Sequence, residues 1–352
     1  MAMKSAGEYA VFPDSRVDAE SPLPLLSVRD LEVEFATSAG VVTAVNGVSF
    51  DLHRGETVAI LGESGSGKSV TAQAIMGIIP RPAGRILGGG ISYDGTDLLG
   101  RDAKRLRRLR GAEIAMVFQD PLTSLNPVFR VGAQIAEMFQ RHRGASRKEG
   151  RDAAIELMRR VGIPAAHRRV DDYPHQFSGG MRQRVMIAIA IALGPKLLIA
   201  DEPTTALDVT VQAQIMDLLA GLQEETGMSL ILITHDLGVV ADVADRVLMM
   251  YGGRIVESGG IQEVYEQPGH PYTRGLMGAI PTLDGRKARL APIKGSPVDL
   301  LNLPSGCAFH PRCPYQTQLC VDERPGLGVI ASRPPSHRAA CHFAEEVVAD
   351  EN

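Results

Sequence analysis

The sequence lacks several features that would place it in particular protein classes. Its 352 residues include no tryptophan, and aromatic residues make up only 5% of the chain. The longest apolar stretch, Val185–Leu193, is about half of the roughly 20 residues that a membrane-spanning helix needs. The 37 basic and 41 acidic side chains leave a net charge of -4, which would not attract nucleic acid or an anionic membrane surface. We therefore expect a globular chain with no membrane span and no nucleic acid partner.

The beginning of the chain also lacks the apolar core of a secretion signal. Residues 1–24 carry charged side chains throughout and three prolines, so we expect a disordered tail and a protein that stays in the cytosol. Cysteine is scarce as well, with four residues in all. In a reducing compartment these are expected to be free thiols or metal ligands rather than structural disulfides.

Hydrophobic patterns predict a mixed α/β chain. Alternating apolar residues over 26–52 indicate antiparallel strands with a turn at Ala39-Gly40. Later runs are short and continuously apolar, which is typical of strands covered on both faces by helices; they lie at 57–61, 197–200 and 229–234. Helical patterns separate these runs, at 69–77, 152–161, 181–193 and 211–225. The alternation predicts a doubly wound α/β core.

The chain is too long for this core alone. A single core usually stops growing at roughly 250 to 300 residues, so a second, smaller part is expected. The composition changes after about Glu266, and 11 of the 22 prolines fall between Pro268 and Pro335. We therefore place a domain boundary there, with a large domain over 25–266 and an irregular extension over 267–352.

A glycine-rich segment follows the apolar run at 57–61 and opens a helix. Its three glycines permit backbone conformations that let consecutive N–H groups surround phosphates. Lys68 would supply charge to the β- and γ-phosphates, and the Ser69 hydroxyl is placed to ligate Mg²⁺. The predicted ATP-binding residues of this segment are Gly62, Glu63, Ser64, Gly65, Ser66, Gly67, Lys68, Ser69 and Val70.

Two further apolar runs end in side chains that suit phosphate chemistry. Asp201 and Glu202 follow the run at 197–200, and strand ends are where ligands sit in such sheets. We expect Asp201 to be a partner of Mg²⁺ and Glu202 to activate water as a general base. His235 ends the run at 229–234 and is placed to donate to the γ-phosphate; the alternative is a structural histidine.

Together with Ser178-Gly179-Gly180-Met181-Arg182, these motifs make the chain resemble the ABC-type ATPases from Leu25 to about Glu266. The resemblance implies a P-loop (RecA-like) core, an N-terminal antiparallel β subdomain and a helical subdomain over about 120–185. It also implies that Gln119 senses Mg²⁺ and that Asp208 belongs to the D-loop. Phe35 is the candidate for stacking on adenine, with a core phenylalanine as the alternative. Phe177 and Met181 depart from the commonest signature, and we do not expect this to abolish activity.

The signature has a physical reason as well. Ser178 is a good N-cap, and Gly179 and Gly180 leave N–H groups bare at the start of an apolar helix, which makes a second anion site. In the family this site grips the γ-phosphate of the ATP held by the opposite subunit. The resemblance therefore implies a second ATPase subunit as partner, usually a different chain, so that the pair is a heterodimer.

All four cysteines fall in one 35-residue window. They are Cys307, Cys313, Cys320 and Cys341. Their spacing lacks the tight pairs usual in structural zinc sites, so we expect a [4Fe-4S] cluster, with zinc or unligated thiols as alternatives. His270-Pro271-Tyr272-Thr273-Arg274, followed by Pro297–Leu300 and the cysteines, resembles the C-terminal region of oligopeptide and dipeptide importer ATPases.

This second resemblance implies a function. ATP-driven dimer closure would power two membrane permease subunits, fed by an external solute-binding protein, at the cytoplasmic face of the inner membrane. The iron-sulfur cluster belongs to the same resemblance. Di- or oligopeptides are the expected cargo, and importers of the same group carry nickel, opines, glutathione or sugars instead. A soluble ABC ATPase acting on DNA, ribosomes or iron-sulfur assembly is the alternative of a different class.

Overall fold

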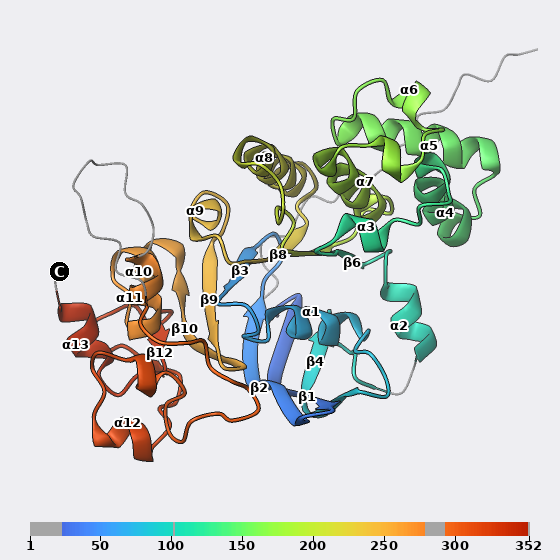
Figure 1. Cartoon of the computed structure of the whole chain (residues 1–352). Helices are drawn as coiled ribbons and strands as arrows, with labels where there is room; N and C mark the ends of the chain where they lie inside the picture. The colour runs from blue at the N-terminus through green and yellow to red at the C-terminus, as the bar shows by residue number, and fades with distance from the viewer. Residues whose placement is uncertain (1–22, 101–102, 279–292, 351–352) are drawn as a thin grey trace, which may run out of the picture. The chain divides into compact units, whose positions relative to one another are not determined.

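The computed structural model describes residues 23–100, 103–278 and 293–350. The disordered tail predicted at 1–24 lies outside these residues except for its last two. The described chain forms two compact units: a first unit of residues 103–230, and a second unit that combines residues 23–100 with residues 231–278 and 293–350 (Figure 1).

The second unit begins with a four-stranded antiparallel sheet in the order β2–β1–β4–β5. β1 (Leu26–Thr37) and β2 (Gly40–Leu52) form a hairpin, which confirms the predicted strands and turn. β4 (Gly84–Tyr93) pairs with the other edge of β1, and β5 (Thr96–Asp97) pairs with β4. The inward side chains of the hairpin, such as Val33 and Val45, are fully buried.

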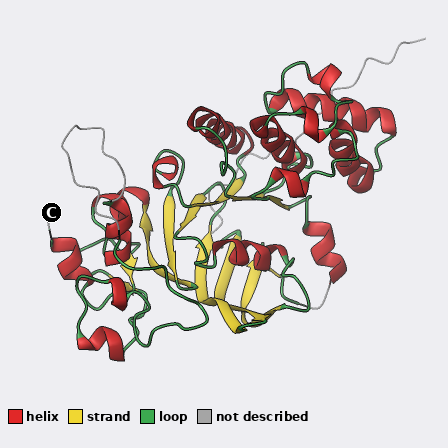
Figure 2. Ribbon diagram, viewed as in Figure 1, coloured by secondary structure: helices red, strands yellow, loops and turns green. Residues whose placement is uncertain are grey.

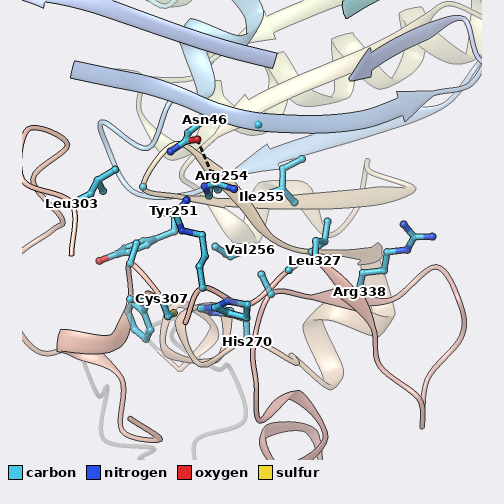
Figure 3. A pocket seen from close by; sticks show the side chains of 18 of the residues that line it. Asn46, Tyr251, Arg254, Ile255, Val256, His270, Leu303, Cys307, Leu327 and Arg338 are labelled. Atoms are coloured by element: carbon cyan, nitrogen blue, oxygen red, sulfur yellow. Dashed lines mark hydrogen bonds between the residues drawn. The ribbon is translucent and has the colours of Figure 1, made fainter. Parts of the chain in front are cut away.

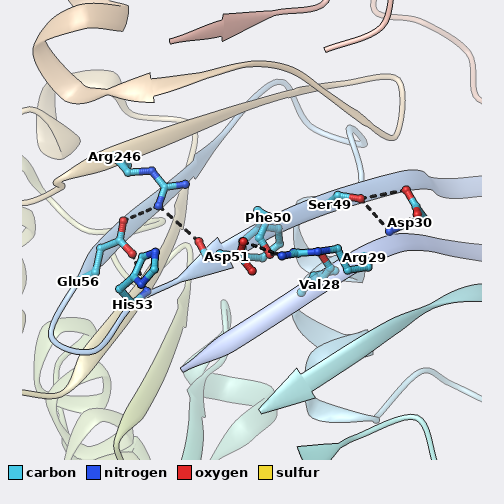
Figure 4. Close-up of polar contacts among 9 residues, drawn as sticks. All are labelled: Val28, Arg29, Asp30, Ser49, Phe50, Asp51, His53, Glu56 and Arg246. Carbon is cyan, nitrogen blue, oxygen red and sulfur yellow. Dashed lines mark hydrogen bonds and ion pairs between the residues drawn. The ribbon is translucent and has the colours of Figure 1, made fainter. Parts of the chain in front are cut away.

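Polar side chains fasten the hairpin at its surface (Figure 4). Arg29 on β1 pairs with Asp51 on β2 at 2.7 Å, and the Ser49 hydroxyl donates to the Asp30 carboxylate at 3.1 Å. Arg246 donates to Glu56 at 2.7 Å and so ties the loop after β2 to β9. These contacts hold the hairpin beside the buried strands that follow it.

A second group of strands in this unit runs in the order β11–β12–β10–β9–β3. β3 (Thr57–Leu61) and β9 (Arg246–Tyr251) are parallel, and β10 (Arg254–Gly260) returns antiparallel to β9. The C-terminal extension adds β12 (Arg338–Ala339) and β11 (Gly328–Val329) to this edge. The extension is therefore part of the same sheet rather than a separate appendage.

The first unit holds two buried parallel strands and about half of the described helices (Figure 2). β6 (Ile114–Val117) pairs with β7 (Leu197–Asp201), and every residue of both strands is buried. β8 (Ser229–Thr234) carries the chain into the second unit. The helices are α2 (Ala103–Leu109), α3 (Pro121–Ser124), α4 (Val131–Arg143), α5 (Arg147–Arg160), α6 (Ala166–Arg169), η1 (Pro174–Gln176), α7 (Gly179–Ile191) and α8 (Val209–Thr226).

The second unit carries shorter helices. They are α1 (Lys68–Met76), α9 (Leu237–Val240), α10 (Ile261–Glu266), α11 (Pro271–Met277), η2 (His310–Arg312), α12 (Gln318–Asp322) and α13 (Ala344–Ala349). The four predicted helices correspond to α1, α5, α7 and α8, and the α/β fold class is confirmed. Within the described ranges, no helix combines the length and the apolar character needed to cross a bilayer.

Candidate nucleotide site and four-cysteine pocket

The phosphate loop, residues 62–69, joins β3 to α1 in the second unit. A Cβ at Gly62 would lie 2.2 Å from the carbonyl oxygen of Met250, and one at Gly67 would lie 2.3 Å from that of Ala44. Gly67 also has a φ of 103°, which favours glycine. Neighbouring backbone therefore requires glycine at both positions. At Gly65, no heavy atom of the described residues comes within 4 Å of an added Cβ, so this side of the loop is open.

Lys68 is the basic group of this loop, and its side chain is buried. Its Nζ donates to the carbonyl oxygens of Gly62 at 2.8 Å and Glu63 at 2.9 Å. Ser66 is also buried, whereas Ser64 is exposed. Ser69 and Val70 are half-buried in the first turn of α1. The loop thus presents a cation and the start of a helix, which suits a polyphosphate.

Glu63 is held by the C-terminal extension, which the sequence did not indicate. Arg312 donates to both carboxylate oxygens of Glu63, at 2.8 and 3.0 Å. The backbone N–H of Glu63 donates to the hydroxyl of Tyr272 at 2.7 Å. The segment 270–274, singled out by resemblance, therefore reaches the phosphate loop through Tyr272.

The predicted carboxylates end β7 in the first unit. Asp201 is 4% exposed, and Glu202 has a φ of 46°, a conformation that non-glycine residues rarely adopt. The Glu202 carboxylate accepts from the Gln119 side chain at 2.9 Å and from the Thr205 hydroxyl at 2.8 Å. Two sequence-predicted residues that lie 83 positions apart are thus brought together.

The signature residues form the start of α7 in the same unit. The Ser178 hydroxyl accepts from the backbone N–H of Met181 at 3.3 Å, as expected of an N-cap. A Cβ at Gly179 would lie 3.3 Å from the Leu207 side chain, and one at Gly180 would lie 2.5 Å from the Val211 side chain. Both glycines therefore leave room for neighbouring side chains, and an anion-binding role of their N–H groups stays a prediction.

Residues around the signature also have defined places. Asp208 caps α8 by accepting from the backbone N–H of Val211 at 2.9 Å. Phe177 is 2% exposed, and the Arg169 guanidinium lies 5.8 Å from its ring centroid. The unusual residue before Ser178 thus fills a core position.

Phe35 and His235 lie in the second unit. Phe35 is half-buried on β1, and its ring packs where a Cβ at Gly84 would be, 2.6 Å from Phe35 Cε1. His235 is exposed directly after β8, and Asp236 caps α9. Adenine stacking by Phe35 and phosphate contact by His235 stay predictions.

All four cysteines line one small cavity in the second unit, together with His270, His310 and His342. Burial raises the pKa of Cys313 to about 11 and that of Cys341 to about 12, and the neighbouring thiols add to both shifts. Such thiols stay protonated near neutral pH unless a bound cation lowers their pKa. Over the part of the chain that the structure describes, no group of three or more Cys, His, Asp or Glu side chains is spaced to hold a metal ion.

A larger cavity, of about 330 Å³, shares Cys307 and His270 with the small one (Figure 3). Its walls come from β2, from β9–β10 and from the extension, and include Tyr251, Arg254 and His270. Arg254 donates to the Asn46 side chain at 2.7 Å. No sequence pattern indicated this cavity, because its walls come from three distant segments.

A glycine-rich loop between a buried strand and a helix, a second strand that ends in Asp-Glu, and a Ser-Gly-Gly helix start define the class of ABC-type ATPases. Family models agree: residues 45–205 match "ABC transporter" and residues 256–320 match "Oligopeptide/dipeptide transporter, C-terminal region". A dimeric ATP-binding cassette in a post-hydrolysis state, bound to ADP and Pi, is 28% identical, with a TM-score of 0.61 over 67% of this chain and 98% of that chain.

Two relatives extend the similarity over nearly the whole chain. The dipeptide transport ATP-binding protein DppD of Bacillus subtilis is 50% identical over 92% of this chain and 95% of the relative. The oligopeptide transport ATP-binding protein OppD of Salmonella typhimurium is 51% identical over 95% of this chain and 99% of the relative. The chain belongs to this family of ABC transporter ATP-binding subunits, and it is an ATPase of that family.

Proposed function

We propose that this chain is the ATP-hydrolysing subunit of a membrane importer for di- or oligopeptides. The observation that carries the proposal is the similarity over nearly the whole chain, including most of the extension, to proteins named for dipeptide and oligopeptide transport. The subunit would work as a peripheral protein on the cytoplasmic face of the inner membrane. It would drive permease subunits that receive cargo from an external solute-binding protein.

We further propose a role for each site residue. Lys68 and the N–H groups of residues 62–70 hold the phosphates, and Phe35 stacks on adenine. Ser69, Gln119 and Asp201 would hold Mg²⁺, which supplies charge neutralisation at the phosphates. Glu202 takes a proton from the attacking water, and His235 donates to the γ-phosphate. The hydrogen bonds from Gln119 and Thr205 support this role, because they orient the Glu202 carboxylate.

The signature would serve the nucleotide of a second ATPase subunit, most simply of a different chain. Exposure supports this role, because Ser178 and Gly179 are open to solvent at the start of a 13-residue helix. Leu207 and Val211 are the side chains nearest to the signature glycines. Asp208 lies beside these glycines as well, because it follows Leu207 in the chain and accepts from the backbone N–H of Val211. ATP binding would then close two subunits on each other, and hydrolysis would release them.

Exposed apolar side chains of the first unit support a membrane permease as the next partner. Leu122, Val128 and Phe129 are 66%, 73% and 56% exposed, and they follow Gln119 closely in the chain. Clustered exposed apolar side chains mark interaction sites. A permease that docks on this segment would be linked to Gln119, and through it to Glu202.

We also propose that the four cysteines bind a [4Fe-4S] cluster. The donor set supports this, because four thiols and no carboxylate are found among the described residues that line the cavity. Cys307, Cys313, Cys320 and Cys341 would be the ligands. Anaerobic purification should give about four irons per chain with broad visible absorbance. Stoichiometric zinc, or no metal, would exclude the cluster.

Isolation of the chain from membranes tests the transport proposal. We expect permease subunits to copurify, and we expect the reconstituted complex to hydrolyse ATP faster when its solute-binding protein is loaded with di- or oligopeptides. Copurified ribosomes or DNA would contradict the proposal. Stimulation by nickel, opines, glutathione or sugars but not by peptides would keep the importer and change its cargo.

A further inference from the structure

We propose that Arg312 and Tyr272 of the C-terminal extension are positioning residues for nucleotide binding, which they support through Glu63 of the phosphate loop. The inference rests on the proposed function, because it takes residues 62–69 as the phosphate site. It goes beyond that function by making the extension part of the machinery that shapes the site.

The ion pair between Arg312 and Glu63 has the geometry of a strong contact. Both terminal nitrogens of the guanidinium donate to the carboxylate, at 2.8 and 3.0 Å, so the two groups meet as parallel forks. The Arg312 side chain is 7% exposed and that of Glu63 is 22% exposed. Little water is available to replace either partner, and loss of one would leave a poorly solvated charge.

Other contacts fix the guanidinium where Glu63 needs it. Nε of Arg312 donates to the carbonyl oxygen of Lys294 at 3.1 Å. The guanidinium carbon lies 5.9 Å from the ring centroid of Tyr251 and 5.8 Å from that of Phe309, within cation–π range. The hydrogen bond with Glu63 also raises the pKa of Arg312. The group is thus a charged and immobile support.

Tyr272 holds the backbone of the same loop residue. Its hydroxyl accepts from the N–H of Glu63 at 2.7 Å, and its side chain is fully buried. The ring packs on Tyr251 and Phe309, with centroids 4.7 and 5.5 Å away. The same aromatic cluster therefore orients both contacts to Glu63.

Charge explains why the support matters for a nucleotide. Glu63 places a carboxylate in a loop that is to receive a polyanion, and an unpaired carboxylate there would repel it. Arg312 neutralises this carboxylate and keeps it turned toward the extension. Arg312 directly precedes Cys313 in the chain. The inference therefore links the conformation of the four-cysteine segment to the conformation of the phosphate loop.

A charge-removal series tests the inference on the full chain. We expect Arg312→Gln to raise the Kd for MgATP about tenfold, and we expect Glu63→Gln in the same chain to restore it to within about threefold of wild type. The Kd recovers because the double variant no longer has an unpaired carboxylate at position 63. If Arg312 had only a structural role, the second substitution would not restore the Kd. A fluorescent ATP analogue competed with MgATP gives the Kd values.

Arg274→Gln is the matched control. Arg274 ties α11 to the rest of the extension, through Tyr315 at 3.1 Å and the carbonyl oxygen of Val347 at 2.9 Å. We expect this variant to lower the melting temperature and leave the Kd unchanged. A Kd for Arg312→Gln within twofold of wild type, or a double variant as weak as Arg312→Gln, would overturn the inference.

Two further variants keep the result interpretable. Should Arg312→Gln not fold, Arg312→Lys replaces it, because lysine keeps the charge but cannot form the two parallel hydrogen bonds. A Kd for MgATP raised about threefold in Arg312→Lys supports the inference, and an unchanged Kd overturns it. Lys68→Ala tests the proposed function separately. If Lys68→Ala binds MgATP as tightly as wild type, residues 62–69 are not the phosphate site and the proposed function is contradicted. If Lys68→Ala binds MgATP more weakly but Arg312→Gln does not, only the proposed role of the extension is contradicted.

Discussion

The molecule has two glycine-rich segments that open helices, and they are constrained in different ways. In the phosphate loop, added Cβ atoms at Gly62 and Gly67 would meet backbone oxygens of Met250 and Ala44. In the signature, they would meet the side chains of Leu207 and Val211. Backbone in a sheet cannot withdraw, whereas a side chain can be shortened. The glycines of the phosphate loop are thus required by fixed backbone, and we call this loop the frame. The glycines of the signature are required by side chains, which a mutation can make smaller.

The difference matches the division of work proposed for the two segments. The frame serves the nucleotide of its own chain, so damage to it should appear as lost binding. The signature serves the nucleotide of a partner, so damage to it should appear as lost turnover in the assembled complex. The experiments below separate these two effects.

Glu202→Gln should separate binding from turnover most completely. Gln keeps the size of the side chain and can still contact Thr205, but it cannot take a proton from water. We expect hydrolysis by the assembled complex to fall by on the order of 1,000-fold, with MgATP binding by the chain retained. Steady-state phosphate release measures the first and nucleotide titration the second. Near-normal hydrolysis would remove Glu202 as the base.

Gly67→Ala should destroy the frame. The new Cβ would lie 2.3 Å from the Ala44 carbonyl oxygen, at a φ of 103° that alanine avoids. We expect the Kd for MgATP to rise on the order of 100-fold. Gly65→Ala is the control, because it shares the positive φ of 79° without the close approach. Equal losses in the two variants would show that backbone conformation, and not the neighbouring strand, is the constraint.

The free energy of unfolding should decrease in acid because of His270, which lies at the start of α11. Burial lowers the pKa of His270 to about 3 from its ordinary 6.5. Between these values the unfolded chain binds a proton that the folded chain does not, so the free energy of unfolding falls as the pH falls. The loss from this group between pH 7 and pH 4.5 is about 2.5 kcal/mol.

His270→Asn isolates this contribution. His270 Nδ1 accepts from the backbone N–H of Tyr272 at 3.1 Å at the start of α11, and asparagine is a good N-cap that does not titrate. Denaturant titrations at both pH values should show a smaller acid loss in the variant than in wild type. Identical losses would place the acid sensitivity elsewhere.

Gly180→Ala should have the smallest effect on hydrolysis, and a second substitution should rescue it. Its Cβ would lie 2.5 Å from Val211 Cγ1. We expect hydrolysis by the assembled complex to fall about tenfold, with MgATP binding by the chain unchanged, since moderate overpacking costs about 1 to 3 kcal/mol. Val211→Ala in the same chain should restore most of the activity. Failure of that rescue would mean that the backbone of the signature itself is at fault.

The sequence predicted elements whose signal is local. β3 and β7 were evident from short apolar runs, and Ser178 caps α7 as predicted. β4 was not predicted because Gly88-Gly89-Gly90 breaks its alternation. The structure explains Gly89, since a Cβ there would lie 2.4 Å from the Asp30 carbonyl oxygen.

Long-range contacts were beyond the sequence. The clustering of the cysteines predicted that they share one site, but nothing in the sequence indicated that three histidines line the same cavity. Arg312 and Glu63 are 249 positions apart, and neither residue type is unusual in its local segment. The sequence analysis assigned roles to Gln119 and Glu202 separately and did not predict the hydrogen bond between them.

A structure of the membrane-extracted complex, trapped with MgATP through the Glu202→Gln change, tests the central proposal most directly. The account predicts that each nucleotide lies between the phosphate loop of one ATPase subunit and the residues 178–180, or their counterparts, of the other. A closed complex in which residues 178–180 lie far from every bound nucleotide would contradict it.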